Sequence, residues 1–408
     1  MNRRRLVLCL GAGQMISWGI TYYLVGALGL AMAAGLGWSS TRIQGGFALA
    51  LLAMGLCSPR LGEISDRHGG RAVMCAGSLF NAAGCAMLAM AHGSLAYYAG
   101  WLLLGLGMRC TLYDAAFAAL ARIGGGDVAG TGRAMAQITL PGGLSATLFW
   151  PLGQALCEAA GWRAALWVYA LLALCTLPLH CSLPSGRNSK GALASSPPPQ
   201  DTPPLAREPR QILLSGILFA ALTTLANFLN AGMSAHMISI LGGMGVAGAL
   251  AVWIAALRGV GQSAARLMDI LFARGINPLS LNLLACLLLP LAFAIGLAAA
   301  GSAVATIAFA LLYGAGNGLL SITRGTLPLS LFDHRSYGGF VGRLVAPGFV
   351  LSAAAPVLYA WLMQALGARA GMWLSGVCAL AILAAAAALR MMFPRRSPGA
   401  HVAGISAK

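Results

Sequence analysis

Charged residues are scarce in this 408-residue chain, and acidic residues are the scarcest of them. Only 9% of the residues are charged and only nine are Asp or Glu, whereas soluble domains carry about 25% charged residues. So few charges cannot cover a soluble surface, which excludes a soluble enzyme, a secreted disulfide scaffold and a disordered chain. Hydrophobic residues make up 59% of the sequence, and this predicts a membrane protein.

Several signals of chemistry are also missing. The ten cysteines form no C-x-x-C pair, and the six histidines show no metal-ligand spacing. The sequence contains no H-E-x-x-H, paired-histidine or H-x-x-x-x-D motif of the kind that an integral-membrane enzyme would need. The net charge of +17 is not gathered in a soluble domain and does not alternate with aromatic residues. We therefore predict no enzyme activity, no metal or other cofactor and no nucleic-acid partner.

Long stretches of the sequence contain no charged residue. Because about 20 apolar residues cross a bilayer as a helix, the 47-residue run 211–257 and the 49-residue run 275–323 hold two crossings each. The run after Arg3–Arg5 is too long for a signal peptide, so we expect a retained first helix. Division of the runs predicts an all-α protein with twelve transmembrane helices, at residues 6–34, 41–58, 72–91, 95–121, 134–157, 164–183, 211–241, 246–266, 278–300, 303–323, 344–366 and 370–392.

Basic residues fall mainly on one side of these predicted helices. The positive-inside rule then places both termini in the cytoplasm. Residues 184–210 contain seven prolines and almost nothing apolar, which is typical of an extended linker. The expected organisation is a six-helix bundle at 1–183, this cytoplasmic linker, a second six-helix bundle at 211–393 and a cytoplasmic tail at 394–408.

The two predicted bundles repeat short sequence patterns. Pro141-Gly142 recurs as Pro347-Gly348, and Gly105-x-Gly107 recurs as Gly314-x-Gly316. These and neighbouring matches are separated by 206 to 210 positions, a nearly constant offset. A constant offset indicates a duplicated six-helix unit, which is typical of secondary transporters.

The segment between the second and third predicted helices reads Gly62-Glu63-Ile64-Ser65-Asp66-Arg67-His68-Gly69-Gly70-Arg71. It resembles the G-x-x-x-D-R-x-G-x-R signature of the major facilitator superfamily, in the loop where that family carries it. The resemblance covers essentially the whole chain. It implies two pseudo-symmetric bundles that expose a midplane site to each side of a bacterial inner membrane in turn, in a functional monomer whose partners are the lipid bilayer, a small solute and a candidate coupling proton.

In the resembling family this loop is a conformational latch. Asp66 is expected to dock at the positive N-terminal end of the eleventh helix, while Gly62 and Gly69 allow the turn. Arg67 and Arg71 are expected to brace the loop, with Asp127 as a candidate partner. The alternative is a solvated loop that only sets topology. A degraded copy, residues 261–266, keeps an arginine but has Ala265 where the first copy has Asp66.

Polar residues recur at helical spacing inside several predicted helices. Membrane helices turn such stripes toward the bundle interior, and in the resembling family the first, fourth, seventh and tenth helices line the cavity. Backbone bonding and close packing are the alternative for single small polar residues. The predicted substrate cavity comprises Gln14, Trp18, Tyr22, Arg109, Tyr113, Asn227, Asn230, Arg258 and Asn317.

Two predicted cavity residues are arginines that need partners inside the membrane. Arg258 resembles the carboxylate-binding arginine of monocarboxylate and oxalate carriers, and a structural role near the cytoplasmic gate is the alternative. Arg109 keeps only the arginine of an R-x-x-Q-G signature found in the fourth helix of many family members. Asp114 is the candidate proton site, and an ion pair with Arg109 or Arg133 is its alternative.

The combined pattern predicts a secondary active transporter for a small anionic or oxygen-rich solute, such as a monocarboxylate or an oxyanion. The face formed by Trp18 and Tyr22 equally suits export of an apolar, drug-like compound. The sequence is also similar to a bacterial branch of the family associated with arsenite efflux. A membrane sensor or scaffold without transport is the alternative from another class, and the direction of transport stays open.

Overall fold

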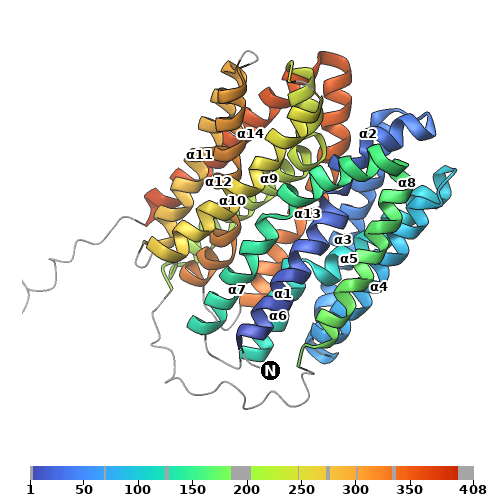
Figure 1. Cartoon of the computed structure of the whole chain (residues 1–408). Coiled ribbons are helices and arrows are strands. Elements are labelled where there is room, and N and C mark those ends of the chain that lie inside the picture. The colour runs from blue at the N-terminus through green and yellow to red at the C-terminus, as the bar shows by residue number, and fades with distance from the viewer. Residues whose placement is uncertain are drawn as a thin grey trace, which may run out of the picture.

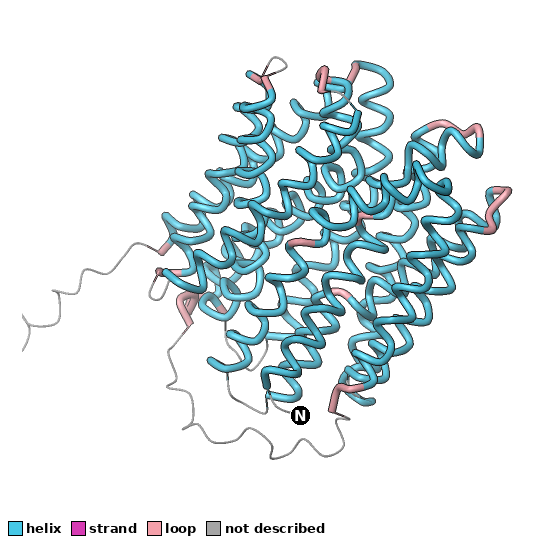
Figure 2. The backbone as a smooth tube through the Cα atoms, in the orientation of Figure 1, coloured by secondary structure: helices cyan, strands magenta, loops and turns pink. Residues whose placement is uncertain are grey.

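The chain is helical throughout the part that the computed structural model describes, namely residues 3–68, 70–124, 128–184, 204–246, 248–272, 276–299, 302–332 and 337–393. Within these ranges, the side chains described exclude those of 59, 62, 63, 65–68, 121, 122, 124, 128–132, 329, 337–343, 345 and 346. The described residues contain no β-strand (Figure 2). The helices are α1 (Arg3–Ser17), the π-helix η1 (Trp18–Tyr22), α2 (Leu24–Leu36), α3 (Ser40–His68), α4 (Gly70–Ala89), α5 (Ser94–Thr111), α6 (Tyr113–Gly124), α7 (Val128–Gly143), α8 (Ser145–Cys181), α9 (Pro209–Gly243), α10 (Gly248–Phe272), α11 (Pro278–Ala298), α12 (Ala303–Leu331), α13 (Tyr337–Leu366) and α14 (Ala368–Met392).

Ten stretches of the described helices are long and apolar enough to cross a membrane. This confirms a multi-pass helical membrane protein, while the count of twelve crossings stays a prediction. One of the ten stretches, Arg133–Cys181, has 49 residues, far more than one crossing needs. Within it the backbone of Gly161 adopts φ 81°, a conformation that glycine reaches without steric cost, and α8 bends there.

Three local features differ from the sequence expectation. The Gly62–Arg71 motif was expected in a loop, but α3 continues as a helix to His68 and α4 begins at Gly70. The fourth predicted helix is divided at Leu112, whose backbone is extended with ψ −174°. The fifth is divided at Leu144, three residues after Pro141, which has no backbone N–H to continue the helical hydrogen bonds.

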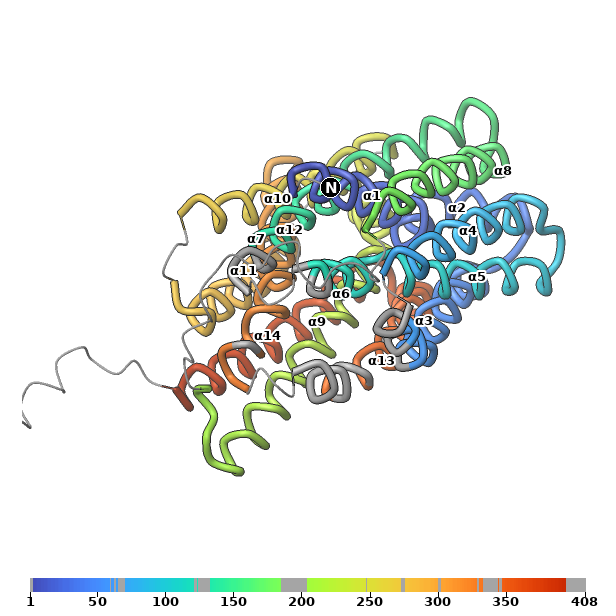
Figure 3. Tube along the Cα trace, turned by 90° about the horizontal axis from the view of Figure 1, so that it is seen from below, coloured from blue at the N-terminus to red at the C-terminus, as the bar shows by residue number. Residues whose placement is uncertain are grey.

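We call residues 3–183 the N-half and residues 209–393 the C-half. In Figure 3 the N-half elements lie mainly to the right and the C-half elements to the left, with α13 beside α3 and α7 beside α10. The contact between α3 and α13 is antiparallel, because Thr41 bonds to Gln364 while Gly55 touches Phe349. The contact of α10 with α7 and α8 is also antiparallel. The halves therefore meet along two interfaces of the same kind, in addition to a contact of α2 with α9.

The ends of the two halves gather at one end of the bundle. The start of α1, the end of α8 and the start of α9 all lie at the lower end in Figure 1. At this end the backbone N–H groups of Leu205 and Ala206 donate to the carbonyls of Ser330 and Leu331, so the segment before α9 is tied to the end of α12. An even number of crossings in the N-half would produce this placement.

Candidate functional site

Arg258 of α10 is a fully buried charge at the meeting point of α9, α10 and α12. Its side chain has 0% exposure. The guanidinium donates to Ser234 Oγ at 3.0 Å and to Asn230 Oδ1, and it lies 4.9 Å from the ring centre of Tyr313. Its Nε atom has no hydrogen-bond partner. Every described partner of Arg258 is therefore neutral.

Asn230 of α9 links Arg258 to further residues of the C-half and to one residue of the N-half. Its Oδ1 atom also accepts from Asn317 Nδ2 at 3.0 Å, so α9, α10 and α12 of the C-half meet at one amide oxygen. Its Nδ2 atom donates to Tyr22 OH at 3.1 Å, across the boundary to η1 of the N-half. Four predicted cavity residues, Tyr22, Asn230, Arg258 and Asn317, are thus brought into one hydrogen-bonded network.

Aromatic side chains form the N-half wall of this network. The Trp18 ring lies 4.9 Å from that of Tyr22 and 5.0 Å from that of Tyr113, measured between ring centres. Gln14 fixes the indole by accepting from Trp18 Nε1 at 3.2 Å, and its own amide donates to the Thr111 carbonyl at 2.7 Å. The Thr111 carbonyl is available because the helix is divided at Leu112, so the break positions this wall.

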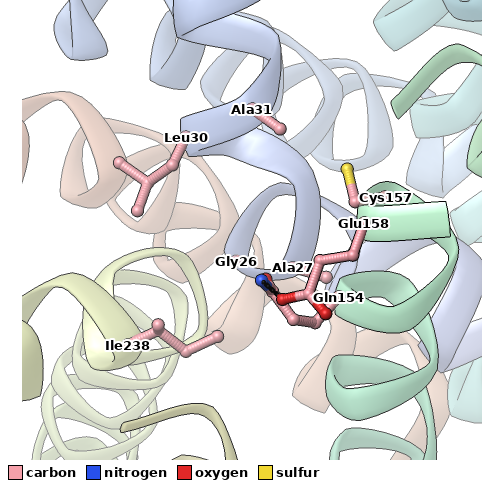
Figure 4. Close-up of a pocket in the computed structure, with 8 residues that line it drawn as sticks. All are labelled: Gly26, Ala27, Leu30, Ala31, Gln154, Cys157, Glu158 and Ile238. Carbon is pink, nitrogen blue, oxygen red and sulfur yellow. Dashed lines mark hydrogen bonds between the residues drawn. The ribbon is translucent and has the colours of Figure 1, made fainter. Parts of the chain in front are cut away.

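A close contact between the halves separates the network from a cavity. A Cβ atom added at Gly26 of α2 would overlap the backbone oxygen of Ser234, the residue that binds Arg258. Beyond this contact lies a cavity of about 400 Å³, lined by α2, α8 and α9 (Figure 4). Its polar side chains include Gln154 and Glu158, joined by a hydrogen bond of 2.6 Å. The cavity is apolar elsewhere, so its chemistry differs from that of the arginine network.

A second contact between the halves closes the opposite side of the network. Arg266 of α10 is 0% exposed and donates to Tyr113 OH at 3.2 Å and to the Thr139 carbonyl, both in the N-half. Its Nη2 atom donates to Ser321 Oγ of the C-half at 2.8 Å. The arginine of the degraded motif copy therefore bridges the two halves.

Three other predicted site residues lie apart from this network. Arg109 donates from Nε to Ser58 Oγ of α3 at 2.7 Å. Asn227 accepts from Arg324 Nη1 at 3.1 Å, one turn away from Asn230. Asp114 is half-buried in the first turn of α6, and the described side chains form no ion pair between it and either Arg109 or Arg133.

The predicted gating residues are only partly within the described structure. Gly62, Asp66 and Arg67 lie on α3, but their side chains are outside the described residues, as are Gly69 and Asp127 entirely. Arg71 is exposed at the start of α4. The latch roles of these residues stay predictions.

Four contributors to the network were not predicted as cavity residues: Tyr23, Ser234, Tyr313 and Arg266. Ser234 extends the stripe of Asn227 and Asn230 by one further turn, so its spacing was a usable signal. Tyr313 is four residues before Asn317 on the same helix. Tyr23 had no such signal, because its neighbour Tyr22 already occupies the polar stripe.

The described residues contain no group of three or more His, Cys, Asp or Glu side chains able to hold a metal ion. The closest thiol pair is Cys75 and Cys181, whose Sγ atoms lie 3.4 Å apart at the ends of α4 and α8. This pair lies outside the arginine network. The arrangement as a whole places guanidinium and amide groups of the C-half opposite aromatic rings of the N-half, between two contacts that join the halves.

Comparison with known proteins assigns this architecture. A search of curated proteins gave no match. The family profile described as Major Facilitator Superfamily matches residues 10–342, which cover both halves up to α13. Because the match extends over most of the sequence, this chain belongs to the Major Facilitator Superfamily.

Proposed function

We propose that this secondary transporter carries a small anion, with a carboxylate or oxyanion group bound to Arg258. Membership of the superfamily supports secondary transport in general. The anionic substrate rests on one observation, the 0% exposed guanidinium of Arg258 held only by neutral described partners. Its unpartnered Nε atom leaves a donor for a further acceptor.

The buried positive charge of Arg258 is not compensated by a described carboxylate. A buried ion costs several kcal/mol, and this cost is offset only by an opposite charge with good hydrogen bonds. The described side chains place no carboxylate within ion-pair distance of Arg258 or Arg266. An anionic solute would supply the missing charge, and a planar guanidinium holds carboxylates and oxyanions with two parallel hydrogen bonds.

The aromatic wall supports a further feature of the substrate. Trp18, Tyr22 and Tyr113 present ring faces and edges opposite the amide and guanidinium groups. Such a surface favours a compact apolar body attached to the charged group. A monocarboxylate has both parts. A purely apolar compound for export is the second candidate, because the same rings would hold it, but it would leave Arg258 uncompensated.

Alternating access is supported by the two contacts that flank the network. Gly26 against Ser234 lies on the side of the cavity, and Arg266 against Thr139 lies on the other side. Opening one contact while the other is closed would expose Arg258 to one side at a time. The antiparallel register of α3 and α13 carries the end of α3 toward the first turn of α13, which supports Asp66 as a latch on that helix end.

The proposal places the protein as a monomer in a bacterial inner membrane, with both termini in the cytoplasm. The excess of arginine on the side of the termini supports this orientation. The cavity at Glu158 would then face the opposite side. Asp114 is the proposed proton site, because it is half-buried beside Tyr113 at the break in the fourth crossing. The direction of transport is not part of the proposal.

Flux into proteoliposomes tests the proposed substrate class. Radiolabelled lactate, oxalate and phosphate are compared with tetraphenylphosphonium as an apolar cation. We expect uptake of at least one anion, and we expect Arg258→Gln to raise its apparent KM by about 30-fold or more, the effect of roughly 2 kcal/mol lost from a charged hydrogen bond. The melting temperature should not fall, because the change removes an uncompensated buried charge.

Arg163→Gln is the matched control. Like Arg258, Arg163 lies close to an aromatic ring, 4.1 Å from that of Trp162, and it donates to the backbone carbonyl of Ala91, but it is not part of the network. Anion flux should be unchanged in this variant. Transport of the cation alone, or equal effects of the two substitutions on anion flux, would refute the anion anchor. Absence of any flux with intact, folded protein would favour a sensor or scaffold.

A further inference from the structure

Arg266 combines a buried charge with a position at the boundary of the halves. It is 0% exposed, and its described partners are a tyrosine hydroxyl, a backbone carbonyl and a serine hydroxyl. A structural latch needs only hydrogen bonds, which a neutral amide would supply without the cost of burying a charge. The guanidinium also lies 5.7 Å from the ring centre of Tyr113, but no described carboxylate compensates its positive charge.

The position of Arg266 relates it to the anion anchor. Arg258 and Arg266 are eight residues apart on α10, which corresponds to about 12 Å along a helix and about 80° around it. Gln262 lies between them, one turn from each, and its Oε1 atom is buried without a hydrogen-bond partner. Gln262 thus places a buried polar atom without a partner between the central network and the second contact.

We propose that Arg266 is a second anion-binding residue on the substrate route, and that a bound anion releases it from the N-half. The proposal rests on the anionic substrate proposed above. An anion that binds the Nη1 edge of Arg266 must replace Tyr113 OH and the Thr139 carbonyl, because these groups occupy that edge. Both belong to the N-half, so occupation of Arg266 removes the contact that joins the halves there.

The consequence is a coupling between substrate position and opening. A ligand shifts a conformational equilibrium only by its differential affinity for the two states. An anion at Arg258 leaves the contact closed, whereas an anion at Arg266 is compatible only with the open contact. Ser321 stays with Arg266 in both states, because it lies on α12 of the same half. The guanidinium is therefore held in place for the arriving anion.

Equilibrium binding to purified protein tests this second residue separately from the anchor. Radiolabelled lactate, oxalate and phosphate are titrated by scintillation proximity on wild type, Arg258→Gln, Arg266→Gln and the double variant. We expect Arg258→Gln to weaken binding about tenfold or more and to leave residual binding that the double variant lacks. If the residual binding of Arg258→Gln persists unchanged in the double variant, the second residue is refuted and the anchor stands. If Arg258→Gln binds like wild type, the anchor is refuted.

Transport by two conservative variants separates charge from hydrogen bonding. Arg266→Lys keeps the charge, whereas Arg266→Gln keeps an amide donor for the Thr139 carbonyl. We expect the lysine variant to retain several-fold more anion flux than the glutamine variant. Equal flux, or more flux in the glutamine variant, would show that Arg266 acts only as a latch. Melting temperatures of both proteins verify that they are folded.

Discussion

The N-half and the C-half meet along matching interfaces but bring different chemistry to the centre. The N-half contributes aromatic rings, with Gln14 holding Trp18 in place. The C-half contributes amides, hydroxyls and guanidinium groups, from Asn230, Ser234, Arg258, Arg266 and Asn317. The two halves therefore resemble each other in how they meet but not in the side chains that they place at the centre.

The different side chains of the two halves suggest how the protein could keep its substrate bound while the halves move relative to each other. All described hydrogen-bonding partners of Arg258 belong to the C-half. The aromatic wall belongs to the other half and makes two described hydrogen bonds to C-half side chains, between Tyr22 and Asn230 and between Tyr113 and Arg266. In the proposed mechanism the substrate stays on the C-half while the wall of the N-half moves across it.

Among substitutions that compare the two halves, the largest effect is expected in the motif that only the N-half keeps intact. Asp66→Asn should lower flux about tenfold or more with nearly normal expression, because a carboxylate at a helix N-terminus contributes up to about 2 kcal/mol. The measurement is initial uptake of a transported anion, normalised to protein in the membrane.

The degraded copy supplies the control for this variant. Ala265→Asn introduces the same amide at the matching position of α10 and should change flux less than twofold. Wild-type flux in Asp66→Asn would refute the latch, and a similar loss in both variants would remove the asymmetry between the halves.

An intermediate effect is expected at the contact between α2 and α9. In Gly26→Ala the new Cβ meets the backbone oxygen of Ser234, which cannot rotate away, so the halves must separate on the cavity side. Cys157 lines this cavity and is half-buried. Its alkylation by a maleimide should become several-fold faster, measured by mass spectrometry on purified protein.

Gly242→Ala is the matched control, because nothing lies within 4 Å of a Cβ at this position of α9. It should leave the alkylation rate of Cys157 unchanged. Slower alkylation in Gly26→Ala would mean that the substitution tightens the contact, contrary to its proposed role in closing the cavity side of the network.

Much of the fold could be predicted from the sequence, because the length of an apolar run and the charged residues at its ends can be read directly along the chain. The predicted helices 278–300 and 370–392 differ from α11 and α14 by no more than two residues at either end. The break at Leu112 was not predictable, because leucine is a good helix former and only the tertiary structure holds it extended. The bend at Gly161 was placed correctly between two predicted helices.

The site was predictable where polar residues recur at helical spacing, as Tyr22, Asn230 and Asn317 show. Partners across different helices were not predictable. Arg109 and Arg258 read alike in sequence, yet Arg109 bonds to Ser58 of α3 while Arg258 joins the central network. From the sequence, Arg266 was interpreted only as a remnant of the motif. Its contact with Thr139 could not be predicted, because the two residues lie on separate segments of the chain.

The smallest expected effect tests whether the N-half contributes aromatic rings while the C-half contributes the polar groups that bind the anion. Tyr22→Phe keeps the ring and removes only the hydroxyl that accepts from Asn230. If the N-half acts as an aromatic wall, the apparent KM for the anion should rise only about two- to fivefold, as for the loss of roughly 0.5–1 kcal/mol. Asn230→Ala removes the oxygen shared by Arg258 and Asn317, so it should raise KM several times more than Tyr22→Phe does. A larger effect of Tyr22→Phe than of Asn230→Ala would mean that the N-half binds the solute through its hydroxyl, and the contrast between the halves would then fail.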